Sequence, residues 1–138
     1  MYCIGLAALA RRLLPWIVVI VASLVAVPAW ADPATEAAAK ALQKKAIEED
    51  FLNLDYPSAI KKLQGAAAKC DGDKCSPPVK GAVLRDLGAM QVLAGNEGDG
   101  RTSFGQAIAL DSTLELDPSY KNPQLDAVWN DVKKKAKP

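Results

Sequence analysis

Residues 84–112 read LRDLGAMQVLAGNEGDGRTSFGQAIALDS, and their pattern is the strongest structural signal in the chain. Apolar residues recur at three- and four-residue spacing on both sides of a glycine-rich turn, which is the period of a helix that buries one face. Gly95 stands where a helix commonly ends in a left-handed residue. The stretch therefore predicts two antiparallel helices, over about residues 77–94 and 99–110. The side chains expected to face the core are those of Val83, Leu84, Leu87, Leu93, Phe104, Ala107 and Ile108.

The same helical period extends to both sides of this hairpin. Towards the N-terminus we expect helices over about residues 35–53 and 57–69, with Asp55 as the cap and Pro57 in the first turn of the second. Towards the C-terminus a helix is expected from residues 122–123 to about residue 135. The sequence thus predicts an all-α fold, an antiparallel array of helical hairpins. The core residues expected in these three helices are Leu42, Ala46, Ile47, Phe51, Leu54, Ala59, Ile60, Leu63, Ala66, Ala67, Cys70, Leu125, Val128, Trp129 and Val132.

The central hairpin also resembles a tetratricopeptide (TPR) repeat, whose consensus is W-x2-L-G-x2-Y…A-x3-F…P. Leu87, Gly88, Phe104 and Ala107 match the consensus without a gap. The departures are Leu84, Gln91, Gly100 and Ser112, which stand at the W, Y, A and P positions. The first hairpin is similar but weaker, with Tyr56, Ala59, Leu63 and Ala66 in register. The resemblance covers about residues 36–112 and implies two TPR-like repeats with a C-terminal capping helix, anchored by Trp129. The alternative is an ordinary alanine-rich helical bundle.

The TPR resemblance implies a binding groove lined by the first helix of each repeat, which takes a protein or peptide segment. Mapped residue by residue, the groove would contain Lys44, Glu48, Phe51, Arg85, Ala89 and Val92. The version of the family that grips a C-terminal carboxylate has Asn where Glu48 stands, so no such clamp is expected here. A solvated helix face is the alternative for Lys44 and Glu48, and a core position is the alternative for Phe51.

The N-terminus has the three parts of a secretory signal peptide. Arg11 and Arg12 precede an apolar run over residues 13–31, which ends in the small-x-small sequence Ala29-Trp30-Ala31. We therefore expect residues 1–31 to be a cleaved signal peptide and residues 32–138 to be one helical domain of an exported protein, periplasmic or secreted. An uncleaved membrane anchor is the alternative, since 19 apolar residues can just span a bilayer.

Two cysteines, Cys70 and Cys75, remain after cleavage because Cys3 leaves with the signal peptide. A disulfide is the default for such a pair in an oxidising compartment. A zinc site would need more ligands than two thiolates, and redox catalysis typically uses C-x-x-C at a helix N-terminus. The cysteine loop lies between the two repeats: Ala59 and Gly100 are 41 residues apart, which exceeds the 34-residue period by seven. We therefore expect a disulfide that constrains an insertion.

The charge and the reactive side chains favour binding over catalysis. Cleavage removes Arg11 and Arg12 from the 17 basic residues, and 15 basic minus 16 acidic residues is −1, so no nucleic-acid partner is expected. The chain has no His, the commonest general base, and we expect neither enzymatic activity nor a cofactor or metal. The expected function is a non-catalytic adaptor or scaffold of the bacterial envelope or secreted fraction. A self-assembling subunit is one alternative. The other is a membrane-surface protein that uses an uncleaved N-terminus or the basic tail, residues 133–137.

Overall fold

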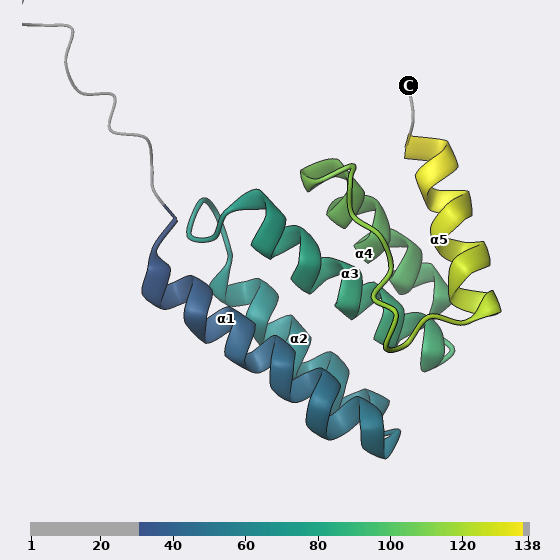
Figure 1. The fold of residues 1–138 in the computed structure, drawn as a ribbon, viewed down its shortest axis with the longest axis horizontal. Coiled ribbons are helices and arrows are strands. Elements are labelled where there is room, and N and C mark those ends of the chain that lie inside the picture. Colours follow the sequence, from purple (N-terminus) through teal and green to yellow (C-terminus); the bar gives the residue numbers. More distant parts are fainter. Residues whose placement is uncertain (1–30, 137–138) are drawn as a thin grey trace, which may run out of the picture.

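The computed structural model describes residues 31–136, which form five α-helices and no strand (Figure 1). The all-α prediction is confirmed. The helices are α1 (Pro33–Lys45), α2 (Tyr56–Lys69), α3 (Pro77–Leu93), α4 (Glu97–Leu110) and α5 (Pro123–Ala136). Each helix packs against the next one in the chain, and α3 and α4 form the most extensive pair. In the part of the chain described, no helix is long and apolar enough to cross a membrane. The predicted signal peptide, apart from its last residue, lies outside the described residues.

The first helix differs from its prediction at its C-terminal end. A π-helical turn (Ala46–Asp50) and a 3₁₀ turn (Phe51–Asn53) follow α1 before the chain reverses. Leu54 ends this segment in the left-handed region, with φ of 58°. Its side chain was predicted to face the core, and this is wrong: Leu54 is 68% exposed at the tip of the α1–α2 hairpin. The helical period that predicted burial has already ended at this residue, so the position no longer belongs to the buried face.

The helix ends follow from local polar contacts and glycines. Asp55 caps α2 as predicted, because its Oδ1 accepts from the Ser58 amide at 3.1 Å. Gly95 has φ of 86°, the left-handed conformation expected after α3. α4 begins at Glu97, two residues before the predicted start. Acidic side chains favour a helix N-terminus, where the macrodipole is positive, so Glu97 and Asp99 both fit the first turn.

The core is centred on α3 and α4, whose backbones approach each other at two glycines. A Cβ placed on Gly88 would lie 2.9 Å from the Gly100 carbonyl and 2.6 Å from the Phe104 ring. Phe104 in turn packs edge-on against Trp129 of α5, with ring centroids 5.0 Å apart. Most predicted core residues are buried, whereas Leu42, Ile47, Phe51, Ile60, Ala67, Leu93 and Val132 are half-buried at its edge. Small residues therefore set the spacing of α3 and α4, and two aromatic rings join them to α5.

Candidate functional site

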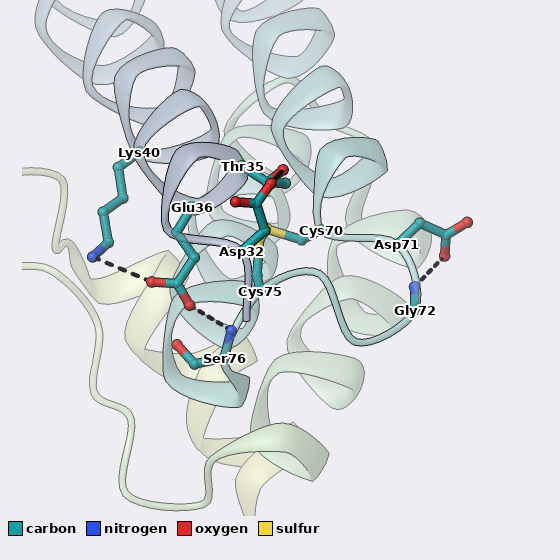
Figure 2. The surroundings of a disulfide bond; sticks show 9 residues. All are labelled: Asp32, Thr35, Glu36, Lys40, Cys70, Asp71, Gly72, Cys75 and Ser76. Carbon is teal, nitrogen blue, oxygen red and sulfur yellow. Dashed lines mark hydrogen bonds and ion pairs between the residues drawn. A yellow bond between two sulfur atoms is a disulfide. The ribbon is translucent and has the colours of Figure 1, made fainter. Parts of the chain in front are cut away.

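The disulfide joins the end of α2 to the start of α3. Cys70 and Cys75 are bonded, with their Cα atoms 4.8 Å apart, and both side chains are buried. The start of α1 lies against this loop, as Figure 2 shows. Asp32 donates its amide to the Lys74 carbonyl at 3.0 Å, and the Glu36 carboxylate accepts from the Ser76 amide at 2.6 Å. Hydrogen bonding to Ser76, first from its side chain and then from its amide, is the main reason why the pKa of Glu36 is lowered.

Three of the predicted groove residues lie together on the surface. Lys44 and Glu48 on α1 and its π-helical turn, and Arg85 on α3, line one shallow cavity of about 240 Å³. Lys44 and Glu48 form an ion pair of 3.8 Å between positions i and i+4, and both side chains are exposed. The other residues that line this cavity, which we call the α1–α3 groove, are Lys40, Gln43, Ile47, Asp86 and Asp117.

The other three predicted groove residues do not lie in the groove. Ala89 and Val92 are 0% and 1% exposed, so neither side chain can contact a partner on the surface. The reason is that α1, α2, α4 and α5 all pack against α3, which leaves it a narrower solvent-facing arc than an isolated repeat would have. Phe51 is half-buried at the edge of the core, near the rings of Tyr56 and Tyr120 at 6.4 and 6.1 Å.

A buried carboxylate lies beneath the α1–α3 groove and was missed by the sequence reasoning. Asp86 is 2% exposed and accepts from three side chains. Gln43 Nε2 of α1 donates at 2.6 Å, Arg85 Nε donates at 2.8 Å, and the hydroxyl of Tyr120 donates to the same Asp86 oxygen as Arg85. Burial raises the pKa of Asp86, and the charge of Arg85 opposes this increase. We call these four residues the Asp86 cluster.

A signal for this cluster is present in the sequence. Asp86 stands three residues after Val83 and four before Met90, and both of these are fully buried. An acid at this spacing lies on the apolar face of its helix and needs partners when it is buried. The nearest cation in the chain, Arg85, is one of those partners. Tyr120, 34 residues further along, could not be assigned to Asp86 by spacing alone.

Arg85 also binds the connection between α4 and α5. Its Nη1 donates to the Glu115 carbonyl at 3.1 Å, and its Nη2 lies 3.8 Å from an Asp117 oxygen. Arg85 therefore has the buried Asp86 on one side and the α4–α5 connection on the other, within a groove that was predicted to take a ligand.

The described residues contain no group of three or more His, Cys, Asp or Glu side chains placed to hold a metal ion. In comparisons with protein-family models, with curated proteins and with solved structures, nothing matches the chain. The TPR resemblance therefore rests on the residues quoted for it.

Proposed function

We propose that the protein is an exported, non-catalytic helical adaptor of TPR-like architecture that binds a protein or peptide segment in the α1–α3 groove. The observation that carries the proposal is the convergence of Lys44, Glu48 and Arg85 in one surface cavity. Lys44 and Glu48 are one helical turn apart, and Arg85 lies about 40 positions further along the chain.

The chemistry of the groove suits a polar, extended segment. Lys40 and Lys44 offer hydrogen-bond donors, while Glu48 and Asp117 offer acceptors, so both the polar groups of a peptide backbone and side chains of mixed charge can find partners in the groove. The pair of Lys44 and Glu48 is exposed, and such a pair contributes little to folding. Its side chains can therefore exchange their mutual contact for contacts with a partner at small cost.

The experiment is a capture of partners from the envelope and secreted fractions of the source organism. The bait is the full chain with a C-terminal tag, expressed in that organism, and mass spectrometry of the purified bait tests cleavage after Ala31. A Lys44→Ala/Glu48→Ala variant is compared with wild type. The control is Asp131→Ala/Lys135→Ala, which removes another i,i+4 ion pair from α5, together with the contact of Asp131 with Arg101 of α4.

The proposal predicts a partner that is retained by wild type and by the α5 control and is lost from the groove variant. Equal retention by all three proteins would refute the groove as the binding site. If no partner is captured in any fraction, or if the bait keeps its N-terminal segment and stays with the membrane, the exported-adaptor proposal is wrong.

A further inference from the structure

The connection between α4 and α5, residues 111–122, is unusually long for a helix–helix connection. It has 12 residues, against about 2–8 for connections between helices in bundles. It runs back along α3 and α4 before α5 begins (Figure 1). Only two of its side chains are buried, Leu116 and Tyr120, each about 5% exposed, and both belong to the core cluster. We call residues 111–122 the α4–α5 segment.

The α4–α5 segment is held in the way that a receptor holds an extended peptide. Side chains of the helices contact its backbone carbonyls: Arg85 contacts that of Glu115, and Lys133 contacts that of Leu114, both at 3.1 Å. Its two buried side chains act as anchors, and the hydroxyl of Tyr120 binds Asp86. Backbone contacts combined with a few buried anchors are the recurring mode of peptide recognition.

The receptor side of this contact is built by other parts of the chain. Asp86 is also held by Gln43 and Arg85, and Phe51 presents its ring to that of Tyr120 at an interplanar angle of 84°. These groups come from α1, its following 3₁₀ turn and α3. The contacts of Asp86 with Gln43 and Arg85 do not involve the α4–α5 segment, so part of the surface beneath the segment is built without it.

These contacts identify the residues through which the α4–α5 segment binds the α3 surface. It consists of an apolar anchor, Leu116, followed directly by an acid, Asp117, and three positions later by Tyr120. Asp117 also lines the α1–α3 groove beside Lys44 and Glu48. A partner in that groove and the α4–α5 segment therefore share Arg85.

We propose that the α3 surface around Arg85 and Asp86 is a binding site for an extended acidic peptide with an apolar-acid-x-x-Tyr pattern, and that the chain's own α4–α5 segment occupies this site and competes with an external peptide. The proposal rests on the proposed adaptor function for its biological role. It adds the chemical class of the partner and an internal inhibitor. Release of Tyr120 is the step that frees the site.

The test uses a fluorescent synthetic peptide of residues 111–122 as the external ligand. Its anisotropy is titrated with wild type, with Tyr120→Phe and with Tyr56→Phe. Tyr120→Phe removes the hydroxyl that binds Asp86 and keeps the ring, whereas Tyr56→Phe makes the same change in another neighbour of Phe51. Because the apparent affinity scales with the fraction of open sites, loss of one hydrogen bond should strengthen peptide binding about tenfold for Tyr120→Phe alone.

The expected result is tighter binding to Tyr120→Phe, unchanged binding to Tyr56→Phe, and a return to the wild-type value when Arg85→Lys is added to Tyr120→Phe. Equal peptide binding to wild type and Tyr120→Phe would overturn the proposal, as would equal strengthening by both tyrosine variants. If Tyr120→Phe does not fold, Asp117→Asn replaces it. Asp117 is partly exposed and holds the same segment to Arg85, so the same two outcomes apply.

Failure of this proposal can be separated from failure of the adaptor function. If partner capture succeeds but Tyr120→Phe and wild type retain the same amount, the adaptor stands and competition by the α4–α5 segment is refuted. If no partner is captured at all, the adaptor function fails, while the peptide titration still decides whether the α3 surface is a peptide site.

Discussion

Replacement of Asp86 should separate hydrogen bonding from charge in the Asp86 cluster. Asp86→Ala leaves the buried hydroxyl of Tyr120 without its acceptor and leaves Arg85 with only the Glu115 carbonyl and the more distant Asp117. Removal of one partner from a buried ion pair costs about 3–5 kcal/mol. We therefore expect Asp86→Ala to lower the free energy of unfolding by about 4 kcal/mol, a large part of the stability of a small domain.

Asp86→Asn should cost much less. The amide oxygen can still accept from Arg85 and from the Tyr120 hydroxyl. In the wild-type protein the Gln43 side chain donates to the other carboxylate oxygen of Asp86. In the variant, a half-turn of the Gln43 amide would let its oxygen accept from the new NH₂ group. The variant loses the attraction between the carboxylate and Arg85, but it also avoids the desolvation cost of burying a negative charge. A net loss of about 1–2 kcal/mol is expected, by analogy with buried polar groups that keep their partners.

The assay is urea unfolding followed by far-UV circular dichroism, at neutral and at acidic pH. Burial raises the pKa of Asp86, so its contribution to stability is fully present below the ordinary carboxylate pKa and is lost as the pH rises through the raised value. Other carboxylates, such as Asp55 and Asp131, have lowered pKa values and change the stability of wild type and variant alike. The stability of wild type relative to Asp86→Asn should therefore increase as the pH falls.

Two results would refute the reasoning about the Asp86 cluster. If Asp86→Ala and Asp86→Asn cost the same, the preserved hydrogen bonds contribute nothing that can be measured. If the difference between wild type and Asp86→Asn stays constant with pH, or decreases as the pH falls, burial does not dominate the titration of this carboxyl group.

Three further stability predictions follow from the fold, and each can be checked by thermal unfolding. Gly88→Ala should lower the free energy of unfolding by about 2 kcal/mol, because a helix-propensity gain of about 1 kcal/mol is outweighed by a clash of the new methyl group with the Gly100 carbonyl. Gly98 has open space around it, so Gly98→Ala should be neutral or slightly stabilising. Equal effects of the two variants would refute the close approach of α3 and α4. Leu54→Gly should stabilise by about 1 kcal/mol by relieving a left-handed φ at an exposed position, and a loss of stability would show that Leu54 packs against something. Reduction of the bond between Cys70 and Cys75 should lower the free energy of unfolding by about 2 kcal/mol and leave the helices folded. Complete unfolding on reduction would mean that loop-closure entropy underestimates how much this disulfide stabilises the domain.

Much of the fold could be predicted from the sequence because the apolar period and the helix ends are local signals. The period of Val83, Leu84 and Leu87 predicts the buried face of α3, and Gly95 predicts its end. The end of the first helix could not be predicted in this way. Whether the chain continues to Leu54 as a regular helix or leaves it through a π-helical turn depends on tertiary packing, which overrides helical propensity.

The sequence could predict which residues of the candidate site lie on the surface only in part. Lys44, Glu48 and Arg85 were placed by alignment with a repeat, and all three line one surface cavity. Ala89 and Val92 were placed by the same alignment, but small and apolar side chains fit a groove and a core equally well. The type of side chain therefore does not tell whether such a residue lies in a groove or in the core. That depends on how many other helices pack around α3.

The polar contacts between α1 and α3 explain how this groove can have fixed walls. At one end Glu36 binds the Ser76 amide next to the disulfide, and seven residues along α1 Gln43 binds Asp86. Both contacts join the same two helices, so α1 cannot slide or rotate along α3 without breaking a bond to a carboxylate. The disulfide, the Glu36–Ser76 contact and the Asp86 cluster thus hold α1 against α3, and the side chains that line the α1–α3 groove are mounted on these two helices.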